Sequence, residues 1–410
     1  MTADATAAAT TTGTAESLLD ETTFVTDGYA EVFARHRRDT PVARDEKYGR
    51  WMLFRYDDVR QAYLDRRLSS KDGTIIGGSL NGQSDSASNR MLICSDNPSH
   101  QRLRKIHSPL FFRSVLKATD TATRQRLSDA AQGFASGGGG DLLSAVLQEL
   151  PVSFLSLAYD IEPADAARLI RLSERLIGYA DPRIGATDRP AARRAQAHLE
   201  LLTEIMKLSA RRTNAPVCPV AVAPERAEAL AEIRERLQQD EFLYNFLNVT
   251  VGGNDTTPYT AASLTEYVLG HDVDELAESY ARDRTGFLAE VFRWTSTNAY
   301  VQRRALCDLE IGGHEIKQGE FVVLWNYSAN FDETYFGADF APQVPHPRPH
   351  LSFGVGAHRC IGAQVAAVEI ECYLDWLLPR AGAMTLPGPF ERLHSTFMRG
   401  FTSAEVGMAV

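Results

Sequence analysis

Several protein classes are excluded by what this sequence lacks. Its five cysteines are odd in number and include no Cys-x-x-Cys pair, so a disulfide framework is not expected in a chain of this size. No run of 18 uninterrupted apolar residues occurs, which argues against a transmembrane helix. An excess of basic residues is also missing: Lys and Arg total 43, Asp and Glu total 53, and the net charge of −10 argues against nucleic-acid binding.

The N-terminus lacks the basic and apolar regions of a signal peptide. Residues 1–17 are mostly Ala and Thr, and none of them is Lys or Arg. We therefore predict a disordered arm over residues 1–17, a single domain over residues 18–410 and a cytoplasmic location.

The hydrophobic pattern after Pro98 is mostly helical, and short strand-like runs follow residue 299. The predicted fold class is mainly α with a small β portion, in which Asp141 caps a helix and Gly312-Gly313 forms a hairpin turn. Helices are predicted over residues 27–38, 98–117, 120–135, 142–158, 163–178, 190–211, 225–234, 239–270, 273–280, 284–296 and 360–378. Strands are predicted near residues 50–56, 299–304, 309–311, 314–316 and 321–325 and in the last thirty residues.

One cysteine stands in a glycine-rich segment, Phe353-Gly-Val-Gly-Ala-His-Arg-Cys-Ile-Gly362, that leads into a predicted helix. Glycines permit tight turns and the close approach of a flat cofactor. The N–H groups and dipole of a helix start lower a thiol pKa and favour the thiolate. A single thiolate cannot complete a zinc site, but it can be the axial ligand of haem iron. The alternative is an inert, buried cysteine beside glycines that serve only a turn.

This segment resembles the signature FxxGxxxCxG of the cytochrome P450 superfamily. The residues at the four fixed positions match: Phe353, Gly356, Cys360 and Gly362. The resemblance implies the P450 fold, with haem b between a long central helix and the cysteine-loop helix, and it implies Cys360 as the metal ligand. It also implies haem contacts from further residues of the loop: Phe353, Gly354, His358 and Gly362.

Glu290 and Arg293 lie three residues apart in a predicted helix and share one face of it. Taken alone, they are compatible with a solvent-exposed ion pair. The superfamily has an ExxR pair at a similar distance before its cysteine, and here Glu290 precedes Cys360 by 70 residues. The resemblance implies a buried, structural pair that ties this helix to the irregular segment before the haem loop.

The predicted central helix contains the run Val251-Gly-Gly-Asn-Asp-Thr-Thr-Pro258. Two glycines and a proline are costly within a helix. Because proline has no N–H, we expect the hydrogen-bond ladder to open here, with Gly252 leaving space for a group to approach the backbone. A kink whose Asp and Thr only satisfy local backbone groups is the alternative.

This run is similar to the (A/G)GxDT segment of the same superfamily. The resemblance implies two catalytic residues. The hydroxyl of Thr256 contacts bound dioxygen, and Asp255 is an acid that helps to deliver protons. It also places Gly252 beside both the haem and the substrate.

Two further segments resemble the superfamily's haem-propionate contacts. His100 and Arg104 are four residues apart on one predicted helix face and match HxxxR, although alone they indicate only a solvated face. Arg303-Arg-Ala-Leu-Cys-Asp308 is similar to R-x-A-x-x-D, which assigns the remaining contact to Arg303 rather than Arg304.

Substrate-contacting residues follow from helix phase and from the resemblance. Asn248 falls on the same helix face as Thr256, so we expect it either to hydrogen-bond a polar group of the substrate or to bond a neighbouring loop. The loop 70–92 and the region 175–192 are expected at the entrance. The complete set of predicted substrate contacts is Asn248, Gly252, Ala299, Val301, Phe397 and Met398.

The resemblance implies a haem-thiolate monooxygenase that inserts one oxygen atom from O2 into a small organic substrate, expected in specialised-metabolite biosynthesis. No nucleotide fingerprint GxGxxG follows a strand, so electrons are expected from NAD(P)H through a ferredoxin and a ferredoxin reductase. The enzymatic alternative is oxidative coupling, cyclisation or rearrangement without net oxygen insertion. A substrate bound to a carrier protein is compatible with all of these reactions. A non-enzymatic haem sensor or carrier is the alternative from another class.

Overall fold

The structure is a computed structural model that describes residues 17–75, 87–184, 189–213, 231, 233, 235–337 and 348–408. Most of the predicted arm, most of the predicted helix 225–234 and parts of both predicted entrance loops lie outside these residues. Ser17 is described, and it corrects the predicted boundary of the arm. Its side chain is buried and its hydroxyl donates to Asp45, so the ordered fold already includes this residue.

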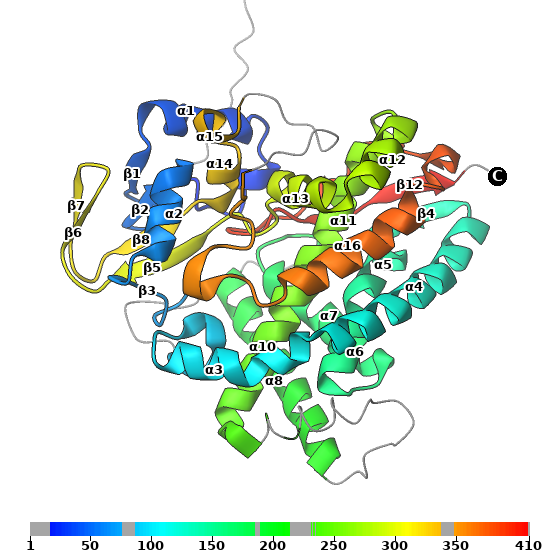
Figure 1. Ribbon diagram of the computed structural model, residues 1–410, viewed down its shortest axis with the longest axis horizontal. Helices are drawn as coiled ribbons and strands as arrows, with labels where there is room; N and C mark the ends of the chain where they lie inside the picture. Colours follow the sequence, from blue (N-terminus) through cyan, green and yellow to red (C-terminus); the bar gives the residue numbers. More distant parts are fainter. Residues whose placement is uncertain are drawn as a thin grey trace, which may run out of the picture.

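Helices form most of the described fold, as predicted (Figure 1). Their bounds are α1 Tyr29–Asp39, α2 Tyr56–Leu64, α3 Ser99–His107, α4 Arg113–Ser136, α5 Leu142–Ala145, α6 Leu150–Tyr159, α7 Pro163–Ile177, α8 Pro190–Thr213, α10 Gln239–Asn254, α11 Thr256–Leu269, α12 Val273–Arg282, α13 Arg284–Thr295, α14 Asn326–Asn330, α15 Glu333–Phe336 and α16 Ala363–Leu377. The strands are β1 Val42–Asp45, β2 Arg50–Leu53, β3 Leu68–Ser69, β4 Gly139–Asp141, β5 Val301–Ala305, β6 Leu309–Ile311, β7 His314–Ile316, β8 Phe321–Leu324, β9 Met384–Thr385, β10 Glu391–Arg392, β11 Phe401–Ser403 and β12 Glu405–Met408.

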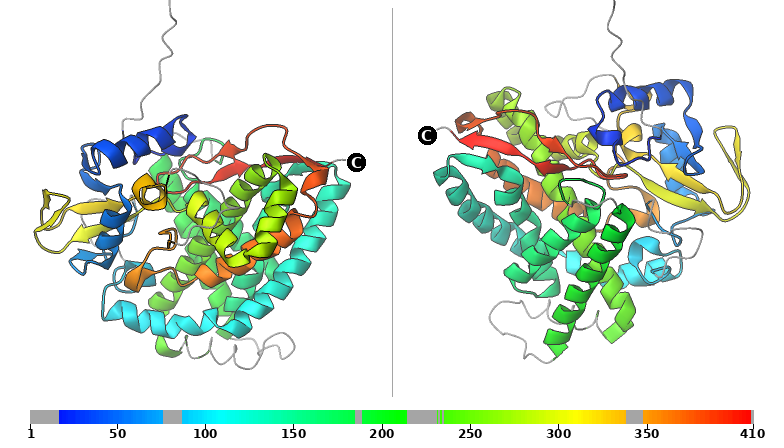
Figure 2. Two further views of the ribbon diagram at one scale, coloured as in Figure 1. Left: turned by 45° about the horizontal axis from the view of Figure 1, so that its top comes forward. Right: turned by 180° about the vertical axis from the view of Figure 1, so that it is seen from behind.

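The largest sheet has the strand order β1-β2-β8-β5-β3 and lies beside α1 and α2, apart from most of the helices (Figure 1). β2 and β8 are parallel and the other pairs are antiparallel. β6 and β7 form the predicted hairpin, and both turn glycines, Gly312 and Gly313, have positive φ angles. A second sheet, β4-β12-β9, joins the C-terminal strands to the turn after α4 (Figure 2).

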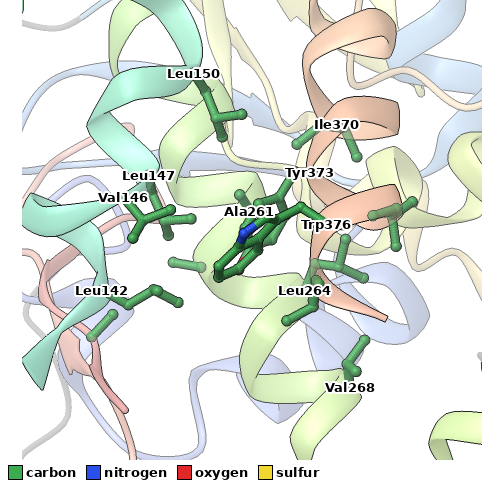
Figure 3. Close-up of a cluster of buried hydrophobic side chains, with 14 of the residues drawn as sticks. Leu142, Val146, Leu147, Leu150, Ala261, Leu264, Val268, Ile370, Tyr373 and Trp376 are labelled. Atoms are coloured by element: carbon green, nitrogen blue, oxygen red, sulfur yellow. The ribbon is translucent and has the colours of Figure 1, made fainter. Parts of the chain in front are cut away.

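The main apolar core lies between three helical segments that are distant in sequence. Figure 3 shows side chains from the α5–α6 region, from α11 and from α16 meeting around Tyr373 and Trp376. The stretch Leu142–Tyr159 is apolar and long enough to cross a membrane by composition, but 67% of it is buried inside this fold and it is divided between α5, a short 3-10 turn and α6. It is therefore a core segment of the described structure.

Two predicted helices differ from those in the structure, and a proline accounts for each difference. The prediction of a single helix over 98–117 is wrong, because α3 ends at His107 and Pro109 lies in a 3-10 turn. The predicted break between residues 117 and 120 is also absent, since α4 runs unbroken through these residues. The predicted helix over 239–270 is split at Asp255 into α10 and α11. The split lies just before Pro258, where the missing N–H was expected to open the ladder.

The predicted cap of Asp141 is confirmed, and α3 begins without a side-chain cap. The Asp141 side chain accepts hydrogen bonds from the N–H groups of Leu143 and Ser144, as expected for an N-cap. By contrast, neither Asp96 nor Ser99 caps α3, whose N-cap residue is Pro98 with no side-chain bond. The Asp96 carboxylate instead accepts hydrogen bonds from the loop after β3.

Candidate active site

One cavity of about 290 Å³ brings together most of the predicted site residues. Its walls come from α3, from α10 and α11, from β5 and from the loop before α16. α10 and α11 run one after the other through the middle of the molecule, beside α16 (Figure 1). The predicted residues on its walls are His100, Arg104, Asn248, Gly252, Thr256, Val301, Arg303, Phe353, Gly354, His358, Cys360 and Gly362.

The cysteine loop is closed by its own backbone. The N–H of Cys360 donates to the carbonyl of Phe353 at 2.8 Å. Gly354 and Gly356, which lie between these two residues, both have positive φ angles. A Cβ atom at Gly356 would lie 2.9 Å from a methyl carbon of the flexible Leu64 side chain, so the positive φ angle is the stricter reason for glycine there. The loop therefore holds the Cys360 side chain on the cavity wall, exposed to the cavity but enclosed by the protein, three residues before α16 begins.

The electrostatic surroundings of the Cys360 thiol correct one expectation. The backbone N–H groups of Gly362 and Ala363 lower its pKa, as a helix start should, and Arg104 acts in the same direction. Burial is the larger effect, and the net pKa of the thiol is raised. A metal ion removes this difficulty, because a coordinating thiol loses its proton on binding.

Four cationic or imidazole side chains gather on the cavity wall. The rings of His100 and His358 lie 4.1 Å apart, and burial lowers the pKa of His358 to about 3, with further lowering from Arg303 and His100. His100 Nε2 is buried and has no hydrogen-bond partner among the described residues. Within the same residues, no carboxylate pairs with Arg104 or Arg303, and the Arg303 side chain donates only to a neighbouring carbonyl.

Strand register separates the two adjacent arginines. Arg303 pairs with Val322 and Arg304 with Phe321, so their side chains leave β5 on opposite faces. Arg303 is buried on the cavity wall, whereas Arg304 forms an ion pair with Asp72 at 2.9 Å. The structure thus places Arg303, and not Arg304, in the candidate site.

The α10–α11 wall carries Asn248, Gly252 and Thr256 into the cavity. The Thr256 hydroxyl donates to the Gly252 carbonyl at 3.0 Å, and a Cβ atom added at Gly252 would meet no atom within 4 Å. Asn245, one turn before Asn248, is instead bonded to the loop before α3, where its Oδ1 accepts from the N–H of Leu92 at 2.8 Å.

Asp255 lies apart from this wall. It is buried, with 1% of its surface exposed, and its Oδ2 lies 3.0 Å from the hydroxyl oxygen of Ser173 of α7, within hydrogen-bonding distance. Burial raises its pKa well above the ordinary value, and the charge of Glu174 raises it further. The predicted acid and the predicted hydroxyl are therefore neighbours in sequence that face different surroundings.

Three predicted substrate contacts, Ala299, Phe397 and Met398, are not among the residues that line this cavity, so their contact with a substrate stays a prediction. Ala299 is fully buried among aromatic side chains, and its N–H donates to the Phe397 carbonyl at 2.8 Å. The regular strand β5 begins only at Val301, so its alternation cannot be extended back to Ala299. Asn298 lines the cavity instead.

Glu290 and Arg293 form a buried ion pair on α13, with a nitrogen-to-oxygen distance of 2.8 Å. Arg293 also donates to the Asn330 carbonyl at 2.7 Å, and its guanidinium lies 4.6 Å from the Phe336 ring centroid. The pair thus connects α13 to α14 and α15, which precede the cysteine loop.

The sequence of this chain is similar to those of known proteins. A family model described as Cytochrome P450 matches residues 285–381, which include Glu290, Arg293 and Cys360. A steroid C26-monooxygenase of Mycolicibacterium smegmatis is 30% identical over 374 residues, covering 87% of this chain and 83% of the relative. The chain belongs to the cytochrome P450 family.

Other P450 proteins resemble this chain to a similar degree. A methyl-branched lipid omega-hydroxylase of Mycobacterium tuberculosis is 29% identical and covers 87% of this chain and 84% of its own. The solved structure of P450 OxyD, described as involved in the biosynthesis of vancomycin-type antibiotics, has a TM-score of 0.81 at 24% identity and covers 96% of this chain and 100% of its own. P450BioI, solved with an acyl carrier protein that bears a fatty acid, has a TM-score of 0.81 at 20% identity and covers 96% of this chain and 100% of its own. The P450 fold expected from the sequence is confirmed.

As a P450 monooxygenase, this protein uses haem, and the cavity fits that group. A haem needs one axial ligand and partners for two propionates. Cys360 presents its sulfur to the cavity, while Arg104, Arg303 and the unpartnered His100 nitrogen supply donors that no described carboxylate occupies.

Glu369 of this P450 was missed by sequence reasoning. It lies nine residues after Cys360 on α16, lines the cavity and is 2% exposed. Burial raises its pKa to about 8, against the lowering effect of its hydrogen bond with Thr257. The sequence of α16 also contains Glu371 and Asp375 and gives no sign that Glu369, rather than either of these, faces the cavity.

Proposed function

We propose that Cys360 is the iron ligand of a haem-thiolate monooxygenase that inserts one oxygen atom from O2 into a neutral, small organic substrate of specialised metabolism. The observation that carries this assignment is the Cys360 thiol on the wall of a cavity that also holds unpaired donors. When bound, the haem supplies the iron at which O2 is activated. The chain supplies the sulfur ligand, the propionate partners, protons and the shape of the substrate site.

The propionates are assigned to His100, Arg104, Arg303 and His358. These residues line one cavity, and burial lowers the pKa of each histidine and each arginine. Burial without a neighbouring anion disfavours the positively charged form of these side chains and so lowers their pKa. The two haem propionates, placed beside these residues, would stabilise the charged form and would accept hydrogen bonds from them.

The substrate is assigned as neutral and able both to donate and to accept hydrogen bonds. The charged or titratable described residues on the cavity wall are the four propionate partners, Arg359 and Cys360 of the cysteine loop, Tyr63 and Glu369. The polar cavity-lining residues of α10 and α11 carry amide and hydroxyl groups instead. Asn298 Oδ1 and Asn254 Nδ2 are buried, lack a hydrogen-bond partner among the described residues and belong to cavity-lining residues. A substrate hydroxyl, which both donates and accepts, would satisfy either group.

The proposed electron source is NAD(P)H. A ferredoxin reductase and an acidic ferredoxin deliver these electrons, and the ferredoxin docks on the face around α3 and the start of α4. Lys105, Arg113 and Lys117 are exposed on this face. Arg102 is paired with Glu241, and His107 is buried with a lowered pKa, so neither adds a free positive charge there. A cytoplasmic location and a single domain over residues 18–410 complete the proposal.

Two measurements test the function. The reduced protein with carbon monoxide should show the red-shifted Soret band of a thiolate-ligated haem, and a spectrum typical of histidine-ligated haem would overturn the assignment of Cys360. Substrates are then found by spin-shift titration of neutral and carboxylate-bearing compounds, steroids and branched lipids included.

Turnover of a binding compound under 18O2 with surrogate ferredoxin and reductase should place one labelled oxygen in the product. A product without label would mean coupling or rearrangement. A compound that binds but causes no NADPH consumption would favour a sensor or carrier.

A further inference from the structure

The buried face of Asp255 meets one helix, α7. Ser173 of α7 is fully buried, and its hydroxyl oxygen lies 3.0 Å from Asp255 Oδ2. The same oxygen lies 3.0 Å from the carbonyl oxygen of Ile170. Glu174, the next residue, is half-buried.

The hydroxyl of Ser173 has one hydrogen but two oxygen neighbours that can accept it. If Asp255 were a carboxylate, the single hydrogen would have to serve both the Asp255 oxygen and the Ile170 carbonyl. If Asp255 carries a proton, it donates to Ser173, and Ser173 gives its own hydrogen to Ile170. Only the second arrangement gives every contact a donor.

The other carboxyl oxygen of Asp255 points to the same protonation state. Asp255 Oδ1 is buried and has no hydrogen-bond partner among the described residues. A buried carboxylate oxygen without a donor is very costly, whereas the carbonyl oxygen of a neutral acid loses much less by burial. Strong burial and the nearby charge of Glu174 raise the pKa of Asp255 in agreement with this.

Glu174 follows Ser173 on α7 and is partly open to solvent, and its charge acts on Asp255. It is half-buried and accepts a hydrogen bond from the Gln148 side chain. Burial raises its pKa to about 7, with Arg171 lowering it and Asp141 raising it. A group of that pKa gains and loses a proton readily near neutral pH. Tyr259 of α11 also faces this cluster, and its own pKa is raised well above the ordinary value by burial and by Asp255 and Glu174.

We infer that Asp255 is held as a neutral acid that donates its proton to Ser173, and that Glu174 is the residue that returns a proton to Asp255 after use. The inference rests on the proposed monooxygenase function. In each cycle the O–H bond of Asp255 breaks, its proton is used to form the water that contains the second oxygen atom of O2, and a carboxylate remains on Asp255. The Glu174 carboxyl group then restores that bond and regains its own proton from solvent, so one proton is taken from water and no electrons move.

The protonation state is tested by infrared spectroscopy of the full-length, haem-loaded protein. The difference spectrum between wild type and Asp255→Asn at pH 7 should contain the C=O stretching band of a protonated carboxyl group. Ser173→Ala should shift that band, because it removes the hydrogen bond to Asp255. If Asp255→Asn removes only a carboxylate band, the neutral acid is disproved. This readout needs no substrate and no turnover, so it stands even if the proposed function fails.

The supply of protons is tested by Glu174→Gln, with Glu149→Gln as the matched control. Glu149 is also half-buried, lies on the neighbouring 3-10 turn and pairs with Arg126 rather than with Asp255. Glu174→Gln should raise the solvent isotope effect and divert NADPH electrons to peroxide, lowering product per NADPH by a factor on the order of ten. The pH profile of the wild-type protein should show an inflection near 7, and the profile of Glu174→Gln should lack it.

Equal coupling, equal isotope effects and equal pH profiles in the two Gln variants would overturn the role of Glu174. A loss shared by both variants together with a lower midpoint of unfolding would likewise count against it, because the effect would then be one of stability. A normal carbon monoxide band in both variants confirms that the haem site itself is intact.

Discussion

The main-chain N–H of Cys360 lies 2.8 Å from the main-chain carbonyl oxygen of Phe353. This bond, together with two glycines of positive φ, shapes the loop without any contribution from the cysteine side chain. The shape of the loop and the identity of its ligand are therefore separable by mutation.

Cys360→Ser should keep the loop and the overall stability but abolish the red-shifted carbon monoxide band, because an alcohol does not replace the thiolate ligand. The matched control is Cys307→Ser, since Cys307 is an exposed free thiol far along the chain from the loop. Carbon monoxide difference spectra of the two variants provide the measurement. A shifted band that survives Cys360→Ser would show that another residue binds the iron.

Arg303→Leu should weaken haem retention, whereas Arg304→Leu should not. The first variant removes a buried guanidinium from the cavity wall, and a hydrogen bond to a charged group contributes about 1.5–3 kcal/mol, or roughly a factor of 10 to 150. The second removes an ion pair with the buried Asp72, which lowers stability, but neither partner lines the cavity. The rate of haem transfer to an excess of an acceptor globin measures both. Equal rates would place the propionate elsewhere.

Arg293→Ala should destabilise the fold by about 3–5 kcal/mol, because it leaves the buried Glu290 carboxylate without its partner. Arg284→Ala is a suitable comparison, since Arg284 is half-exposed, pairs with Asp375 on the surface and should cost less than about 1 kcal/mol. Urea unfolding of both haem-loaded variants gives the two values. Similar costs at the two positions would contradict a structural role for the buried pair.

Asn248→Leu should weaken spin-shift binding of the substrate with little effect on stability, because Asn248 lines the cavity. Asn245→Leu should do the opposite. Asn245 makes hydrogen bonds to Leu92, Arg90 and the Glu241 carbonyl, and each is worth about 1 kcal/mol. An unchanged substrate affinity in Asn248→Leu would mean that this residue makes no polar contact with the substrate.

Glu369 should make the free energy of unfolding depend on pH. Its folded pKa of about 8 lies above the ordinary value of 4.5, so the folded state keeps a proton that the unfolded chain releases. Its stabilising contribution is complete below pH 4.5 and decreases as the pH rises to 8, by at most about 1.4 kcal/mol per pH unit. Glu369→Gln should lack this decrease. Urea unfolding of both proteins between pH 5 and pH 8 checks the difference, which must change with pH if the carboxyl group is neutral in the folded state.

The cysteine loop and the propionate donors could be predicted from the sequence because their spacing is fixed by local geometry. Cys360, Gly354 and Gly356 act within one short loop, and His100 and Arg104 lie on one turn of α3. Even the distinction between Arg303 and Arg304 follows from the alternation of a strand. The roles of these residues remain predictions, but their convergence on one cavity is a property of the structure.

The rest depended on contacts between distant segments. Nothing near Asp255 in the sequence indicates that Ser173 and Glu174, some eighty residues earlier, determine its surroundings. Ala299, which the resemblance places at the pocket, lies before the regular strand β5 begins at Val301 and is not on the cavity wall. The end of α3 was misplaced because the turn at Pro109 was read as part of a longer helix.

The interruption at Asp255 divides the central helix into parts with different neighbours. α10 packs against α6, α7 and α8, whereas α11 packs mainly against α16 and α13, which follow the cysteine loop and carry the buried ion pair, and also touches α5 and α6. Sequence changes in α10 can therefore be absorbed by α7 and α8, whose main contacts are with each other, with α6 and with α10. The fold can in this way acquire new substrates over evolutionary time while its oxygen-activating machinery is inherited unchanged.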